Sequence, residues 1–141
     1  MTRGHLWAAS LIMLSLSFGT SVAPAATPFD GTWNVVVSCT QAPDGARGYR
    51  WQFTAQVRDG SLVGQYNQPG NIPSGTLRGQ IEPTGVAHLT MQGLTGDPDY
   101  ALKRVRAGST IHYTVTAQFN TRSGTGTRDQ ARPCSLSFSR S

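Results

Sequence analysis

The residues that most often carry out chemistry are few in this chain and are not grouped. His88 and His112 each lie on the polar phase of an alternating segment, so both are predicted to face water rather than bind a metal or act as a base. No serine lies in a Gly-x-Ser-x-Gly motif, the nucleophile elbow of many hydrolases. We therefore expect no enzyme activity, no metal site and no cofactor.

Two short segments contain residue types that bind cations or phosphate, and both are interpreted as turns or loops. Asp97 and Asp99 flank Pro98, a pattern more typical of turn chemistry than of an acid/base pair or a calcium site. The run 124–128, Gly-Thr-Gly-Thr-Arg, has the composition of a phosphate-binding loop but no following helix. A flexible hairpin loop is predicted there instead.

Residues 1–25 have the three parts of a secretory signal. Arg3 gives a basic start, an apolar run follows at 6–18, and small residues precede a predicted cleavage after Ala25 or Ala26. Serines and Gly19 interrupt the run, which is too short for a membrane span. We expect the mature chain, one domain over 26–141, to be secreted or to lie in a bacterial periplasm, with no membrane span.

That chain has two cysteines, Cys39 and Cys134, one near each end. Disulfides persist in oxidising spaces outside the cytoplasm. Neither cysteine has a nearby histidine or second cysteine, as a metal or thiol-redox site would require. The pair is therefore predicted to form a disulfide.

Apolar and polar residues alternate through most of the mature chain, with the period of two that β-strands have. In the segment 49–57, for example, Trp51, Phe53 and Val57 alternate with polar residues. The pattern predicts eight strands and no helix. They are expected at 33–39, 49–58, 62–67, 76–82, 86–92, 100–106, 110–120 and 134–140, the sixth with the weakest alternation.

The connections between these strands are of two kinds. Tight turns are predicted at 59–60, 83–85 and 107–109, and Asp59-Gly60 is typical of a two-residue hairpin. Alternate connections of an antiparallel meander lie at the same end, so the long connections should surround one end, the mouth, and the tight turns should close the other. The long connections are 40–48, 68–75, 93–99 and 121–133, all rich in residues that favour turns.

Positive charge is spread along the chain, with 12 Lys and Arg against 7 Asp and Glu. No basic block resembles a nucleic-acid-binding arm, so no nucleic-acid partner is expected. In the predicted mouth connections arginines and aspartates are equal in number, so their charges are expected to cancel; a cationic rim that selects an anion is the alternative. These residues are Arg47, Arg122, Arg128 and Arg132 with Asp44, Asp97, Asp99 and Asp129.

Eight antiparallel strands leave no free edge if the sheet closes into a barrel, with the first strand beside the last. If Cys39 lies opposite Cys134 across that seam, the antiparallel register places Trp33 opposite Arg140. A guanidinium over an indole stabilises by roughly 0.5–2 kcal/mol. The sequence thus predicts an all-β, eight-stranded antiparallel up-and-down barrel whose first and last strands are joined by a disulfide and whose floor carries the pair Trp33 and Arg140.

Two segments carry a resemblance to a known family. Gly31-Thr32-Trp33, with an arginine near it on the last strand, and the segment 59–66, Asp-Gly-Ser-Leu-Val-Gly-Gln-Tyr, are similar to the signatures of calycin barrels, the lipocalins and avidins. The resemblance implies a barrel closed at its floor that holds a ligand through its mouth. Of the positions where avidins contact biotin, Val35 and Cys39 depart from the family and Tyr66 matches, so biotin is not the expected ligand.

We predict a non-enzymatic barrel that binds a small, mostly apolar ligand at its mouth. Inward-facing residues are both small and large, so the sequence leaves open whether side chains fill the interior. A packed lower half with a shallow apolar cup under the mouth is favoured. The candidate lining residues are Trp51, Tyr66, Tyr113 and Phe119.

The alternative hypothesis is a protein-interaction module, such as an inhibitor of a secreted hydrolase or a partner in the cell envelope. Loops on a rigid scaffold often carry such functions. The connection 68–75 places an isoleucine between prolines, where it is expected to be exposed. The candidate contact residues are Pro69, Asn71, Ile72 and Pro73.

Overall fold

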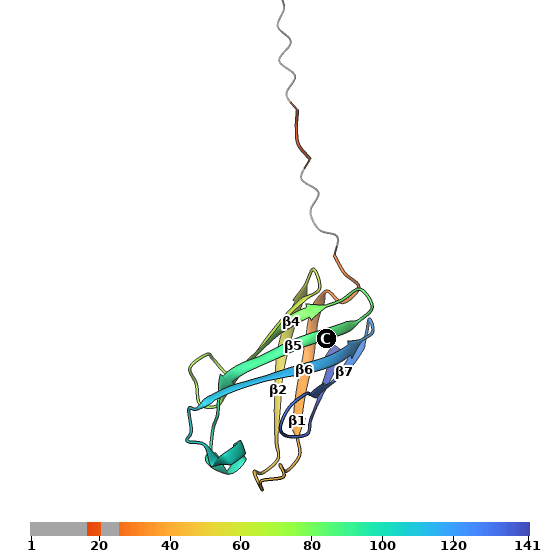
Figure 1. Ribbon diagram of the computed structural model, residues 1–141. Helices are drawn as coiled ribbons and strands as arrows, with labels where there is room; N and C mark the ends of the chain where they lie inside the picture. Colours follow the sequence, from red (N-terminus) through yellow and green to blue (C-terminus); the bar gives the residue numbers. More distant parts are fainter. Residues whose placement is uncertain (1–16, 21–25) are drawn as a thin grey trace, which may run out of the picture.

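Eight antiparallel β-strands close into a barrel in chain order, with β1 beside β8 (Figure 1). This computed structural model describes residues 17–20 and 26–141, and the predicted signal segment 1–25 otherwise lies outside the described residues. The fold predicted from the alternating pattern is confirmed. The strands are β1 (Gly31–Cys39), β2 (Tyr49–Arg58), β3 (Ser61–Tyr66), β4 (Ser74–Ile81), β5 (Val86–Leu94), β6 (Thr110–Phe119), β7 (Ser123–Arg128) and β8 (Cys134–Arg140).

Two predicted elements are wrong, and the errors offset each other in the strand count. Residues 100–106 do not form a strand; two short 3-10 turns, η1 (Pro98–Tyr100) and η2 (Leu102–Arg104), lie there. Residues 124–128, predicted as a flexible loop, belong to strand β7. Glycine weakens strands, which is why the glycines of β7 pointed to a loop.

The glycines of β7 are needed for packing. They face inward, where a Cβ on Gly124 would lie 2.9 Å from the ring of Phe119 and one on Gly126 would lie 3.0 Å from Cβ of Ala117. The glycines of β7 therefore leave the space that the side chains of Phe119 and Ala117 on β6 occupy.

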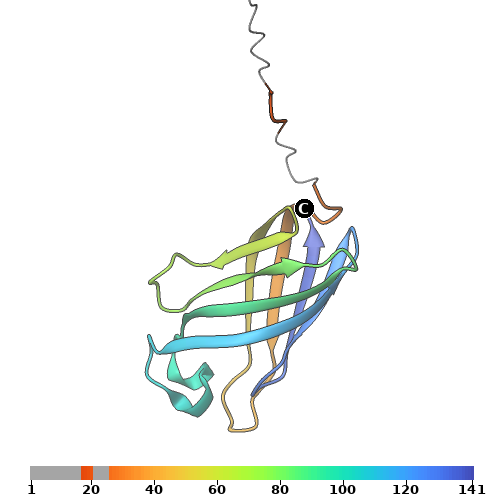
Figure 2. The same ribbon diagram turned by 45° about the horizontal axis from the view of Figure 1, so that its top comes forward.

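Long and short connections lie at opposite ends of the barrel, as predicted, although two of them were misplaced (Figure 2). The turn at 107–109 belongs to the mouth connection between β5 and β6, and Arg122 lies in the tight turn between β6 and β7 at the closed end. In Figure 1 the C-terminus marks the closed end and the 3-10 turns mark the mouth. The mouth connections are 40–48, 67–73, 95–109 and 129–133, and the closed-end turns are 59–60, 82–85 and 120–122.

The seam between β1 and β8 has the register predicted from the cysteines. Cys39 pairs with Cys134 and Trp33 pairs with Arg140. The two cysteines form a disulfide across a sequence separation of 95 residues. The mouth end of the seam is thus covalently bonded, and its other end brings an arginine to a tryptophan.

The closed end is held by that arginine. The guanidinium carbon of Arg140 lies 4.8 Å from the ring centroid of Trp33, which is fully buried. Arg140 also donates hydrogen bonds to the carbonyls of Pro28, Asp30 and Thr121. Because these carbonyls come from both sides of the seam, one side chain ties the N-terminal segment to the turn between β6 and β7.

The interior near the closed end is filled by side chains. The rings of Trp33 and Phe119 meet edge to face with centroids 5.3 Å apart. A Cβ on Gly64 would lie 2.8 Å from the ring of Phe53, and one on Gly79 would lie 2.6 Å from Cδ2 of Leu89. The small inward residues therefore complement large neighbours here.

Asp30 holds the turn between β2 and β3. Its carboxylate accepts hydrogen bonds from the backbone N–H groups of Asp59 and Gly60, at 2.9 and 3.0 Å, and from the hydroxyl of Thr27. Both turn residues have positive φ, as a two-residue hairpin turn requires. The hydrogen bond from Thr27, followed by those from Asp59 and Gly60, lowers the pKa of Asp30 to about 2.

Replacing both cysteines by alanine should lower the free energy of unfolding by about 4–5 kcal/mol, because a long unfolded loop is no longer constrained. Urea unfolding followed by circular dichroism measures this difference. The wild-type protein in excess dithiothreitol serves as the matched comparison. A loss below about 1 kcal/mol in both experiments would contradict a stabilising role for the bond.

The Asp30 carboxylate should contribute stability that disappears in acid. Its pKa in the folded protein, about 2, lies below the ordinary 3.8, so its contribution is complete above pH 4 and is lost as the pH falls towards 2. The gap in urea midpoint between wild type and Asp30→Asn should therefore be largest above pH 4 and close near pH 2. A gap independent of pH would contradict this assignment.

Candidate ligand-binding cavity

A cavity of about 520 Å³ opens at the mouth, above the packed half of the barrel. Its walls come from β2, β3, β6, the end of β7 and the connection between β5 and β6. Most of the lining side chains are aromatic or aliphatic, and several are cationic. The lining includes Tyr49, Trp51, Tyr66, Ile111, Arg128 and Arg132.

One wall of the cavity is aromatic. Trp51 and Tyr66, on neighbouring strands β2 and β3, stack with ring centroids 4.3 Å apart and planes 9° apart. Tyr49 continues the wall, its ring centroid 5.3 Å from that of Trp51. Gly75 on β4 leaves the space behind, since a Cβ there would lie 2.8 Å from the Trp51 ring. The wall presents flat, polarisable surfaces to whatever enters the cavity.

The four candidate lining residues lie at different depths. Trp51 and Tyr66 line the cavity. Tyr113 is 1% exposed and lies beneath the guanidinium of Arg128. Phe119 lies at the closed end against Trp33 and is not part of the lining. The structure thus brings three of the four to the mouth half of the barrel and places the fourth in its floor.

Arg128 is a residue of the cavity that sequence reasoning left in a loop. It is the last residue of β7 and follows Gly124 and Gly126 on the inward phase, so its side chain enters the barrel. Its guanidinium carbon lies 4.1 Å from the ring centroid of Tyr113. Burial lowers the pKa of the Arg128 guanidinium, because the cavity wall desolvates its charged form. The alternation across 123–128 was the signal that could have found it.

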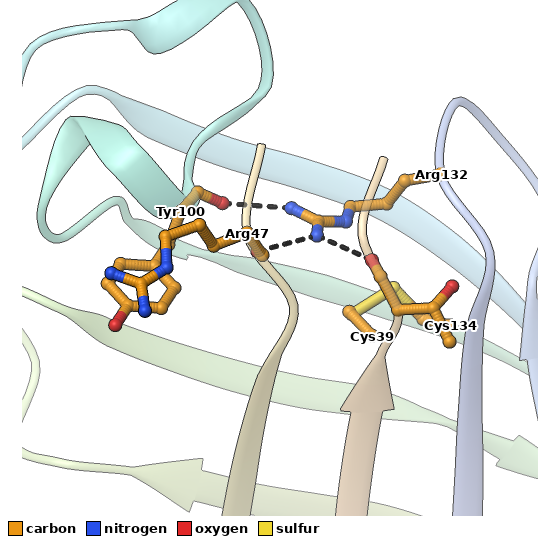
Figure 3. The surroundings of a disulfide bond; sticks show 6 residues. Cys39, Arg47, Tyr100, Arg132 and Cys134 are labelled. Atoms are coloured by element: carbon orange, nitrogen blue, oxygen red, sulfur yellow. Dashed lines mark hydrogen bonds between the residues drawn. A yellow bond between two sulfur atoms is a disulfide. The ribbon is translucent and has the colours of Figure 1, made fainter. Parts of the chain in front are cut away.

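Arg132 joins three segments around the mouth and lies beside the disulfide (Figure 3). Its guanidinium donates hydrogen bonds to the carbonyls of Thr40, Arg47 and Tyr100, at 2.8, 2.9 and 2.8 Å. The side chain is 3% exposed. The connections 40–48 and 95–109 are therefore fixed to each other by one buried cation.

No mouth aspartate of the described residues forms an ion pair with Arg128 or Arg132. Asp97 caps the 3-10 turn η1 by accepting from the backbone N–H of Asp99, which belongs to that turn. Asp129 accepts hydrogen bonds on the outer face from the hydroxyls of Thr114 and Thr116. Asp44 accepts from the backbone N–H of Lys103 and then Ala46, which lowers its pKa. Across 17–20 and 26–141, the one ion pair joins Arg104 and Asp99, 3.4 Å apart on the surface.

The candidate interaction loop lies beside the mouth, between β3 and β4. Ile72 is 56% exposed, and its side chain rests near Gly108 of the neighbouring connection. The side-chain amide of Asn67 donates to the carbonyl of Pro73. Pro69 and Asn71 are exposed. Of these loop residues, Pro73 reaches the cavity lining.

His88 and His112 are both exposed, as predicted, on the adjacent strands β5 and β6. His88 pairs with Thr116 and His112 with Gln92, so the two imidazoles belong to separate positions of the sheet. Among the described residues, no group of three or more histidines, cysteines or carboxylates could hold a metal ion. Nor is any helix in that part of the chain long and apolar enough to cross a bilayer.

Comparisons with protein families, with curated proteins and with solved structures found no match. The disulfide indicates an oxidising environment outside the cytoplasm.

Replacing Arg132 by methionine should lower the free energy of unfolding by about 2–4 kcal/mol, because three carbonyls lose a charged donor. Chemical unfolding measures this change. Arg47→Ala is the matched control, since its exposed side chain stacks on Tyr100 while its carbonyl, which accepts from Arg132, stays in place. The control should change stability by less than about 1 kcal/mol. Equal effects of both substitutions would contradict the proposed bracing role.

Proposed function

We propose that this protein is a non-enzymatic binding barrel that takes a small, mostly apolar ligand into its mouth cavity. The observation that carries the proposal is the stacked pair of Trp51 and Tyr66 forming one wall of a 520 Å³ cavity. Small-molecule sites are typically concave, largely apolar and about 300–1,000 Å³ in volume. A planar or ring-containing ligand would continue the stack and displace water from these surfaces.

The scaffold beneath the cavity favours a preformed site. The closed half is packed, and the mouth connections are tied together by Arg132 and by the disulfide. A site held by such contacts loses little freedom when a ligand binds, which favours affinity. We further propose that the barrel is calycin-like, on the strength of Gly31-Thr32-Trp33 with Arg140 over the indole, and that it works in a periplasm or outside the cell.

The alternative, a protein-interaction module, rests on Ile72. A side chain that is 56% exposed at the tip of a mouth connection is available to enter a pocket of another protein. Ile72 does not line the cavity, so the two functions depend on different residues. Substitutions at each place separate them.

Binding of N-phenyl-1-naphthylamine, a neutral fluorescent probe with fused rings, should depend on the aromatic wall. We expect Trp51→Ala and Tyr66→Ala each to weaken binding about 2–10-fold, because each removes a stacking surface worth roughly 0.5–1.5 kcal/mol. Titration followed by probe fluorescence measures the affinity. Thermal unfolding of each variant shows whether the barrel is retained, and Tyr66, which is half-buried, is the safer substitution.

Ile72→Ser is the matched control, since it changes an apolar residue at the same end of the barrel but outside the cavity. It should leave probe affinity unchanged. Unaltered binding by folded Trp51→Ala and Tyr66→Ala proteins would reject the cavity as the site. Loss of probe binding in Ile72→Ser alone would indicate that the probe binds at the connection between β3 and β4 and not in the cavity.

A further inference from the structure

The cavity contains a cation that the protein does not satisfy. Nε of Arg128 is buried without a hydrogen-bond partner, and no carboxylate among the described residues lies within ion-pair distance of its guanidinium. The Arg128 side chain as a whole is only partly buried, but burying one of its N–H groups without a hydrogen-bond partner is itself unfavourable. Arg140 and Arg132 show that this barrel supplies carbonyls to its other inward arginines. Arg128 is therefore an exception that needs an explanation.

Tyr113 lies directly below Arg128. Its hydroxyl is buried next to that of Tyr49, in a side chain that is 1% exposed. The ring of Tyr113 supports the face of the Arg128 guanidinium at 4.1 Å, which leaves the edge of that guanidinium to meet the cavity. Burial raises the pKa of both Tyr113 and Tyr49, so these phenols are neutral donors at neutral pH.

All but one of the other formal charges around the cavity have the same sign as Arg128. Arg50, Lys103 and Arg132 also line it, and Asp97 is the one carboxylate of the lining. Asp97 is exposed and accepts from the backbone N–H of Asp99 in its own turn. Nε of Arg132 is buried and unpartnered as well, in a side chain that is 3% exposed. The cavity thus combines an apolar wall with an excess of positive charge.

We propose that the ligand of this cavity is an organic carboxylate with a planar, aromatic body, its carboxylate held by Arg128 and its rings against Trp51 and Tyr66. This inference rests on the proposed function and narrows its ligand class. The edge of a guanidinium matches a carboxylate in a planar, bidentate arrangement, and such charge-assisted hydrogen bonds are stronger in a desolvated site. Stacking of Arg128 on Tyr113 holds that edge in one orientation before the ligand arrives.

The charge requirement is tested with a pair of probes that differ in one group. 2-Naphthoate is ionised at pH 7, and 2-naphthamide is its neutral counterpart of nearly equal size. Isothermal titration calorimetry on the wild-type protein should show the carboxylate binding at least about tenfold more tightly than the amide. Equal affinities, or tighter binding of the amide, would overturn the inference while leaving the proposed function intact.

Two charge-matched variants identify the residue responsible. Arg128→Gln should weaken naphthoate binding about 10–100-fold and change naphthamide binding less than about threefold. Arg78→Gln removes an exposed arginine on the outer face of β4 and should leave both affinities within about twofold of wild type. Equal losses in the two variants would mean that general attraction between charges, and not Arg128, selects the anion.

The two proposals fail in different ways. Suppose that Tyr66→Ala weakens naphthamide binding and that naphthoate binds the wild-type protein no more tightly than naphthamide does. The cavity then binds apolar ligands but does not select anions. If neither compound binds, the cavity is not a site for aromatic ligands and both proposals are overturned. Arg128→Lys adds a final check. Because lysine keeps the charge but lacks the planar edge, this variant should bind naphthoate more tightly than Arg128→Gln but less tightly than the wild type.

Discussion

The pairing of the first strand with the last is the constraint on which the rest of the molecule depends. Without it the sheet would have two free edges and no interior. The disulfide between Cys39 and Cys134 sets the register of this seam at the mouth, and that register brings Arg140 to Trp33 at the other end. A single alignment of two strands thus determines both the floor and the opening.

The two ends of the barrel use the same residue type for different purposes. At the floor Arg140 donates to three carbonyls and lies against an indole, so its charge is fully used within the fold. Arg132 likewise donates to three carbonyls and ties the mouth connections together. Arg128 stacks on Tyr113, but among the described residues no hydrogen bond joins its guanidinium to the protein. This difference from two arginines that donate to carbonyls is what points to a ligand.

Much of the fold could be predicted from the sequence, because one wet and one dry face force a period of two along each strand, and two cysteines set the register of the seam. Strand β7 could not be predicted, because glycines stand at its inward positions where the alternating pattern would have apolar side chains. Gly124 and Gly126 leave room there for Phe119 and Ala117. Because of that error, Arg128 was predicted to lie in a loop. Phe119 has the right phase for the interior, but phase alone does not reveal depth along the barrel axis.

The missed strand and the candidate site share one physical cause. Because the inward residues near the start of β7 are glycines, aromatic side chains such as Phe119 of β6 can fill the closed half of the barrel. The first large inward side chain on β7 is Arg128, which lines the cavity above the packed half. Strand β7 therefore places one positive charge at the boundary between the packed half of the barrel and the mouth cavity. An apolar residue there would extend the packed core, whereas an arginine makes the boundary a place where an anion can be recognised.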